Sequence, residues 1–229
     1  MPERTAVIIG ARGGIGAALA DALDAGDQYD RVIQLHRTSA PAIDILDEAS
    51  IAAVARDLAG TAPQLVIVAT GLLHTANKGP EKSLRELDPE WIMENYRINA
   101  VGPALVAKHF LPIMAKQGPI CFAALSARVG SISDNRLGGW HSYRASKAAL
   151  NMFIRNIAIE WQRKNAQSIV VALHPGTVET QLSAPFKGNP AHERFLPARA
   201  AADMLAVLSS LRPEQSGQII AYDGSVIAP

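Results

Sequence analysis

Short runs of β-branched and other apolar residues alternate along the chain with longer stretches of helical period, and this alternation constrains the fold most. The runs at residues 5–9, 31–35, 64–68, 120–125, 169–173 and 217–222 have the length of strands. Apolar residues recur at helical spacing within residues 15–23, 49–58, 89–115, 142–164 and 198–211. Strands joined by crossover helices form parallel sheets. We therefore predict an α/β fold, a Rossmann-type doubly wound parallel sheet with helices on both faces.

Composition indicates one domain and narrows the class of partner. No composition shift, repeat or low-complexity segment divides the 229 residues, so residues 1–229 are predicted to form a single domain. The 22 basic and 21 acidic side chains nearly cancel, which argues against nucleic acid or a membrane surface as a partner. No run reaches the ~20 apolar residues of a membrane span, and the short apolar run near Met1 is no signal peptide. The single cysteine, Cys121, favours a reducing, cytoplasmic location.

A glycine-rich turn follows the first predicted strand. The segment Gly10-Ala-Arg-Gly-Gly14-Ile-Gly16 leads from that strand into the first predicted helix. At such a turn, backbone N–H groups and the positive end of the helix dipole face a pyrophosphate. Glycines also serve ordinary tight turns, but this context favours nucleotide binding.

A tyrosine and a lysine stand four residues apart near the start of the long helix at 142–164. Tyr143 and Lys147 therefore share one helix face. A free phenol has a pKa near 10, too high for efficient proton exchange at neutral pH, and an adjacent ammonium is expected to lower it. A solvated pair with no function is the alternative; the position after a strand in the second half of the sheet favours catalysis.

Taken together, these motifs resemble those of the short-chain dehydrogenase/reductase superfamily over nearly the whole chain. The further matching segments are Asn99 within Arg-Ile-Asn-Ala-Val-Gly-Pro, the Pro175-Gly176 turn ending in Thr180, and Asp223-Gly224. Within the superfamily, the segment around Tyr143 is similar to the branch that contains the bacterial C-factor signalling protein and the fly carbonyl reductase sniffer.

The resemblance implies a set of site residues, and the sequence shows no Cys/His cluster with metal-ligand spacing, so no metal is expected. Tyr143 would be the general acid or base for a carbonyl or alcohol, with Lys147 tuning it and Asn99 kinking its own helix and anchoring a water. A surface amide is the alternative for Asn99. The implied cofactor-binding residues are Gly10, Arg12, Gly14, Ile15, Gly16, Arg37, Asp44, Ile45, Ala69, Gly71, Tyr143, Lys147, Pro175, Gly176, Val178 and Thr180.

The charge after the second strand favours NADPH over NADH. Folds that prefer NAD place a carboxylate there for the ribose 2′-hydroxyl, whereas this chain has His36-Arg37 and a second arginine, Arg12, in the glycine turn. Two guanidiniums can flank one phosphate. Either arginine could instead be a surface charge.

Three features depart from the family pattern. The usual Asn-Asn-Ala-Gly reads Val68-Ala69-Thr70-Gly71 here. Too few residues separate the second strand from Ala42 for a linking helix, so a third strand is either a stub at 42–44 or absent, leaving an irregular segment. Ala127 stands where the family commonly has the serine that contacts the substrate carbonyl. Ser126 is our candidate for that role, with Ser131 and Ser133 as alternatives.

These features predict an NADPH-dependent oxidoreductase that reduces an aldehyde or ketone, or runs the reverse alcohol oxidation. The altered serine keeps a second hypothesis open, a nucleotide-binding signalling or regulatory protein with little turnover. Residues 181–197, with three prolines, are predicted to form a lid in which Leu182, Phe186 and Phe195 cover an apolar substrate pocket. The resemblance also implies a homodimer or homotetramer assembled through the two long helices.

Overall fold

Seven strands form one sheet within residues 3–186 and 194–229, the part of the chain that the computed structural model describes. The strand order is β2-β1-β3-β4-β5-β6-β7, parallel except for β7. The strands are β1 (Thr5–Ile9), β2 (Arg31–Leu35), β3 (Leu65–Val68), β4 (Ile120–Leu125), β5 (Ser168–His174), β6 (Ile219–Ala221) and β7 (Val226–Ile227). The predicted Rossmann-type fold is confirmed, and the antiparallel β7 is an addition to it.

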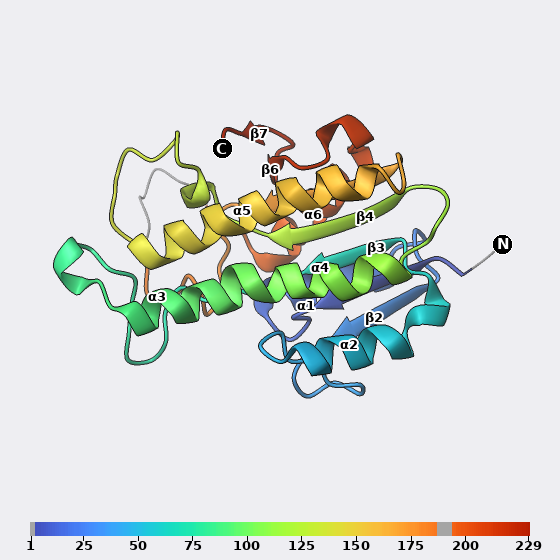
Figure 1. Cartoon of the computed structure of the whole chain (residues 1–229), viewed down its shortest axis with the longest axis horizontal. Coiled ribbons are helices and arrows are strands. Elements are labelled where there is room, and N and C mark those ends of the chain that lie inside the picture. The colour runs from blue at the N-terminus through green and yellow to red at the C-terminus, as the bar shows by residue number, and fades with distance from the viewer. Residues whose placement is uncertain (1–2, 187–193) are drawn as a thin grey trace.

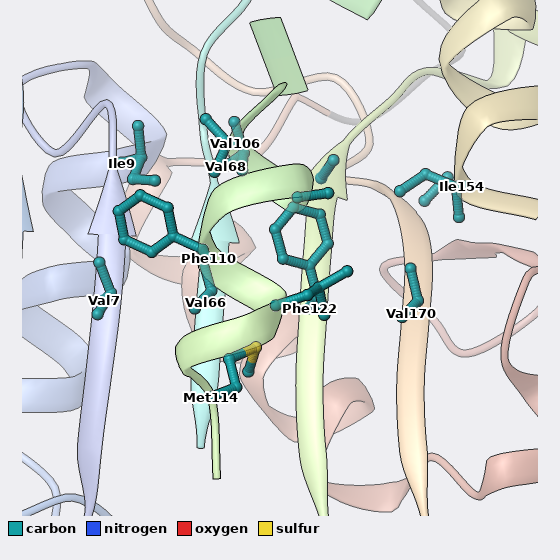
Figure 2. Packing of buried hydrophobic residues seen from close by; sticks show 14 of the residues in the cluster. Val7, Ile9, Val66, Val68, Val106, Phe110, Met114, Phe122, Ile154 and Val170 are labelled. Atoms are coloured by element: carbon teal, nitrogen blue, oxygen red, sulfur yellow. The ribbon is translucent and has the colours of Figure 1, made fainter. Parts of the chain in front are cut away.

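Helices cover both faces of this sheet (Figure 1). One face packs against α2 (Glu48–Asp57), α4 (Gly102–Phe110) and α5 (His141–Gln162), and the other against α1 (Gly14–Asp24) and α6 (Pro197–Ser210). Figure 2 shows the first of these cores, where Phe110 of α4 and Phe122 of β4 lie among valines and isoleucines of the strands. Both phenylalanines are fully buried. Burial on both faces explains why the central strands β1, β3, β4 and β5 read as nearly continuous apolar runs.

No third strand forms between β2 and α2. Residues 36–47 follow an irregular path, as the shortness of the segment allows. Ile43 still reaches the core and is 2% exposed. Asp47 ends the segment as the N-cap of α2, its carboxylate accepting from the Ala49 N–H at 2.9 Å. Of the two alternatives, the irregular segment is the one observed.

The long helix predicted at residues 89–115 is interrupted. It consists of α3 (Pro89–Tyr96), a π-helical turn (Arg97–Val101), α4 and a short 3₁₀ turn (Leu111–Ile113). Asp88 caps α3 through the Glu90 N–H at 2.9 Å, and Pro89 occupies the first turn, where its missing N–H leaves no hydrogen bond unmade. The π turn places Asn99 at the point where the resemblance implies a kink.

The buried face of α5 includes Leu150, Ile154 and Ala158, whereas Phe153 on the same helix is 40% exposed. The predicted lid is only partly within the described residues: residues 187–193 lie outside them, and Pro197 already belongs to α6. Among the described helices, none combines the length and apolar character needed to cross a membrane.

Candidate active site

A cavity of about 850 Å³ opens where β1, β2 and β3 end at the carboxyl edge of the sheet. In the strand order, β2 and β3 lie on opposite sides of β1, and doubly wound folds bind ligands at such a switch point. The volume falls in the range of small-molecule sites. Of the predicted cofactor residues, seven line it: Gly10, Arg12, Arg37, Asp44, Ile45, Ala69 and Gly71.

The glycine-rich turn borders this cavity, and its conformation depends on glycine at two positions. Gly10 has a φ of +89°, a left-handed conformation that favours glycine. A Cβ on Gly16 would lie 2.2 Å from the Gly10 carbonyl oxygen, so the first turn of α1 can approach β1 only without a side chain there. Gly14 begins α1, and Ile15 packs against the apolar cluster under that helix. Gly14, Ile15 and Gly16 therefore shape the turn rather than line the cavity.

Both predicted arginines line the cavity near the end of β2. Arg12 and Arg37 line it together with His36 and Thr38. Arg12 Nη1 donates to Thr38 Oγ1 at 3.2 Å, which links the glycine turn to the segment after β2. Two exposed guanidiniums in one cavity provide the charge that a 2′-phosphate needs.

An orphaned polar atom supports the fit of a nucleotide. Thr70 lines the cavity, and its buried Oγ1 has no hydrogen-bond partner among the described residues. Buried polar groups are normally paired in proteins, so this hydroxyl is available to a ligand.

The second half of the predicted cofactor site continues from the same edge. A Cβ on Gly71 would lie 3.8 Å from Lys147 Nζ, and one on Gly14 would lie 2.9 Å from Thr180 Cγ2. Lys147 therefore lies close to Gly71 at one end of the cavity, and Thr180 packs against the glycine-rich turn.

The turn after β5 is built around a glycine. Gly176 follows Pro175 with a φ of +77°, and a Cβ there would lie 2.6 Å from the Phe195 ring. Val178 is 4% exposed and pairs with Phe195 in an isolated parallel bridge. Phe195 also packs on Tyr222, with ring centroids 4.6 Å apart. Phe195 is therefore a core residue and not part of an apolar substrate pocket, contrary to our expectation.

Tyr143 and Lys147 lie in the first two turns of α5, and both are buried. Lys147 Nζ donates to the Leu125 carbonyl at 2.8 Å and lies 5.8 Å from the centroid of the Tyr143 ring. Burial lowers the pKa of Lys147 to about 7. Burial also raises the pKa of Tyr143 above its ordinary value of 10.0. In this structure desolvation therefore outweighs the lowering that we expected from the neighbouring lysine.

Asn99 is buried within a polar network. Its Oδ1 accepts from the Leu72 N–H and its Nδ2 donates to the Leu72 carbonyl, both at 2.8 Å. Nδ2 also lies 3.1 Å from Ser146 Oγ and 3.3 Å from Asn95 Oδ1. Asn99 is 0% exposed, so the surface-amide alternative is wrong. The network ties the end of the cavity at Leu72 to the helix that carries Tyr143.

Ser126 has a partner of its own. Its Oγ donates to Asn151 Oδ1 at 2.7 Å, and Asn151 lies about two helical turns beyond Tyr143 on α5. Ser131 Oγ accepts from the Asp134 N–H, and Ser133 Oγ donates to the Pro229 carbonyl. Within residues 3–186 and 194–229, no hydrogen bond joins a serine hydroxyl to the Tyr143 phenol.

Sequence reasoning missed several residues at this site. Ile9, Gly13, Ile43, Leu46, Leu72, Thr75 and Ile98 also line the cavity. Beside Tyr143, the ring centroids of Trp140 and Tyr143 lie 6.2 Å apart, and those of Trp140 and Phe186 lie 5.1 Å apart. For the aromatic neighbours of Tyr143, the sequence offered one signal, the position of Trp140 three residues before Tyr143.

Comparisons with known proteins agree with this geometry. A family profile described as enoyl-(acyl carrier protein) reductase matches residues 9–222. The chain is 31% identical over 190 residues to 1-hydroxy-2-glutathionyl-2-methyl-3-butene dehydrogenase of Rhodococcus sp. (strain AD45), covering 83% of this chain and 80% of that protein. It is 32% identical over 145 residues to the protein named C-signal of Myxococcus xanthus, covering 63% and 82% respectively.

Solved structures are similar over their full length. The NADPH-bound carbonyl reductase from chicken fatty liver has a TM-score of 0.85 and 27% identity, with 100% of both chains covered. Carbonyl reductase Sniffer of D. melanogaster has a TM-score of 0.84 and 20% identity at the same coverage, a likeness of fold.

The sheet, the glycine turn and the tyrosine–lysine pair define a Rossmann-type oxidoreductase. The chain belongs to the short-chain dehydrogenase/reductase family, as its motifs predict.

The buried lysine leads to a prediction about stability. Because burial lowers the pKa of Lys147 from 10.5 to about 7, the unfolded chain holds one more proton between these values, and stability rises with pH there. We expect the cofactor-free protein to gain stability from about pH 7 to about pH 8.5 in urea titrations, and Lys147→Met to remove most of that gain. The window stops below 9.0, the ordinary pKa of Cys121, because burial raises that pKa to about 12 and its contribution has the opposite sign. Equal pH slopes for the two proteins would contradict the assignment.

Proposed function

We propose that this protein is an NADPH-dependent oxidoreductase that reduces the carbonyl of an aldehyde or ketone, or oxidises the corresponding alcohol. The observation that carries the proposal is that the turns lining the cavity and the tyrosine–lysine pair lie close together at one edge of the sheet. Gly71 lines the cavity, and a Cβ on it would lie 3.8 Å from Lys147 Nζ. Lys147 in turn shares a helix face with Tyr143. The NADPH named for the chicken carbonyl reductase agrees with the pair of arginines in the cavity.

The residues divide the work as follows. Gly10, Gly14 and Gly16 let the backbone approach a pyrophosphate, and Arg12 and Arg37 bind the 2′-phosphate. Asp44, Ile45, Ala69 and Gly71 line the cavity. Asp44 and Ile45 would hold the adenine, and Pro175, Gly176, Val178 and Thr180 would hold the nicotinamide together with Ala69 and Gly71. The cofactor supplies the hydride.

Tyr143 supplies the proton. Burial raises the pKa of the Tyr143 phenol, so at neutral pH it is protonated and able to donate to the carbonyl oxygen. When the phenol loses that proton, a protonated Lys147 nearby stabilises the phenolate. Asn99 holds the Leu72 backbone and Ser146 around this pair.

We expected the Ser126 hydroxyl to contact the substrate carbonyl, and its hydrogen bond in this structure favours another role. A hydroxyl has one proton, and Ser126 donates it to Asn151. We therefore assign carbonyl activation to Tyr143 and give Ser126 the task of holding the end of β4 against α5.

The signalling hypothesis is the second candidate, favoured by the hydrogen bond that engages Ser126 and by the similarity to C-signal.

One assay separates the enzyme from the signalling protein. NADPH oxidation is followed with benzaldehyde, menadione and cyclohexanone, and NADPH binding is measured by fluorescence. Turnover above the rate without protein supports the enzyme. Tight NADPH binding with no turnover of any carbonyl supports the signalling protein. The lone Cys121 fits action of either kind in the cytoplasm.

We further propose a homodimer or homotetramer formed through α3, α4 and α5, which lie on one face of the molecule (Figure 1). Several large apolar side chains on these helices are exposed, among them Met93, Met152, Phe153 and Ile159. Sedimentation velocity is expected to show a dimer or tetramer, and Phe153→Asp to shift it toward monomer. A parent protein that sediments as a monomer at micromolar concentration would contradict the proposal.

A further inference from the structure

Helix α5 begins without a cap of its own. The residue before it, Trp140, has a left-handed backbone with φ +51°, and its side chain makes no capping hydrogen bond. The first N–H groups of a helix have no intrahelical partners and are normally satisfied by a side chain at this position. Tyr143 lies in this first turn, so whatever satisfies these groups also fixes the phenol.

A buried carboxylate from a distant segment takes the place of the cap. Glu81 is 2% exposed, and its Oε2 accepts from the Ser142 N–H at 3.1 Å. Its Oε1 accepts from the Ser142 hydroxyl. The Glu81 carbonyl oxygen also accepts from the Trp140 N–H at 2.5 Å. Three contacts therefore hold the residues immediately before Tyr143, and they come from a residue 61 positions earlier than Ser142.

The charge of Glu81 suits this position. A carboxylate at the N-terminus of a helix is stabilised by the helix dipole and by N–H donors. Both hydrogen-bonded oxygens face Ser142, which is 1% exposed. Because a buried carboxylate is costly unless its oxygens are bonded, the side chain has little freedom to move away.

The segment that carries Glu81 is anchored separately at its cofactor end. Leu72 lines the cavity, and both its N–H and its carbonyl are bonded to the Asn99 side chain at 2.8 Å. Loss of the Glu81 contacts should therefore loosen the start of α5 and leave the cavity intact.

We propose that Glu81 is a positioning residue for Tyr143: it caps the catalytic helix from outside and sets the place of the phenol. The proposal rests on the function proposed above, and it predicts a loss in kcat with little change in cofactor binding. A shift of about 1 Å in a catalytic group can cost about 10²-fold in rate.

The test compares Glu81→Ala, Glu81→Gln and Ser216→Ala. Glutamine can accept from the Ser142 N–H and donate to its hydroxyl, since a hydroxyl also accepts, so it should preserve the geometry. Ser216 is the matched control: it is 3% exposed and accepts from the Val170 N–H at 2.9 Å, within β5 and away from its carboxyl end. Turnover is measured with NADPH and the most active carbonyl of the panel, and NADPH Kd by fluorescence.

We expect Glu81→Ala to lower kcat by about 10- to 100-fold with NADPH Kd within about threefold of the parent. Glu81→Gln and Ser216→Ala should keep kcat within about threefold. A kcat for Glu81→Ala within that margin overturns the proposal. So does an equal loss in Glu81→Gln, which would point to charge, or in Ser216→Ala, which would point to general destabilisation.

Hydrogen exchange measured by mass spectrometry on residues 141–147 needs no substrate. Exchange there is expected to quicken by about tenfold or more in Glu81→Ala alone, as the first turn frays. If the parent turns over no carbonyl, the proposed function fails and this measurement still decides: unchanged exchange overturns the positioning role. Should Glu81→Ala not fold, Ser142→Ala removes the hydroxyl contact from the other partner, and the same pattern is expected at smaller size.

Discussion

Replacement of Tyr143 by phenylalanine is expected to lower carbonyl reduction by about 10²-fold or more while NADPH binds with near-parent affinity. Phenylalanine keeps the ring that packs beside Trp140 and removes only the hydroxyl. Because burial raises the pKa of that hydroxyl, the parent enzyme holds its proton at neutral pH. The measurement is kcat for NADPH oxidation together with NADPH Kd from fluorescence.

Ser126→Ala is the informative comparison for this variant. The Ser126 hydroxyl donates to Asn151, so its removal should lower kcat by less than about tenfold. Turnover near the parent rate in Tyr143→Phe would remove Tyr143 as the acid. A loss in Ser126→Ala as large as that in Tyr143→Phe would return the substrate-donor role to Ser126.

The strands were the most predictable part of the fold. Residues 120–125 form β4 with the bounds expected from the sequence, since a strand buried on both faces must be apolar at every position. β7 has two residues, too few for any periodicity to show. The residues between β2 and Ala42 could be recognised as too few for a linking helix, but whether residues 42–44 formed a strand depended on packing around Ile43.

The site was predictable where the motif and the chemistry are local. Gly10, Arg12 and Arg37 lie in the turns that follow β1 and β2, so strand ends alone bring them together at the cavity. The partners of Ser126 and Ser142 are different. Asn151 and Glu81 are joined to them only by tertiary folding, and neither has a sequence signal of its own. The direction of the Tyr143 pKa also required the burial that the structure supplies.

The choice of cofactor is expected to depend on Arg37. We expect NADPH to bind the parent at least about tenfold more tightly than NADH, a difference of about 1.4 kcal/mol that one charge-assisted contact can supply. Arg37→Asp should reverse this order. An aspartate after β2 repels a 2′-phosphate and can accept a hydrogen bond from the 2′-hydroxyl of NADH. Binding of NADPH should therefore weaken while binding of NADH strengthens. Arg12, held to Thr38 at 3.2 Å, remains and limits the loss of NADPH.

Arg31→Asp is the matched control, because it makes the same charge change at the other end of β2. Arg31 begins β2 whereas Arg37 follows its end, a separation of about 20 Å along an extended chain. Its own partner is Glu3, at 3.9 Å, and it does not line the cavity. If net charge alone attracted NADPH, both variants would weaken it equally. A direct contact requires that only Arg37→Asp change the ratio of the two dissociation constants. Equal constants for NADPH and NADH in the parent would show that neither Arg12 nor Arg37 binds the phosphate.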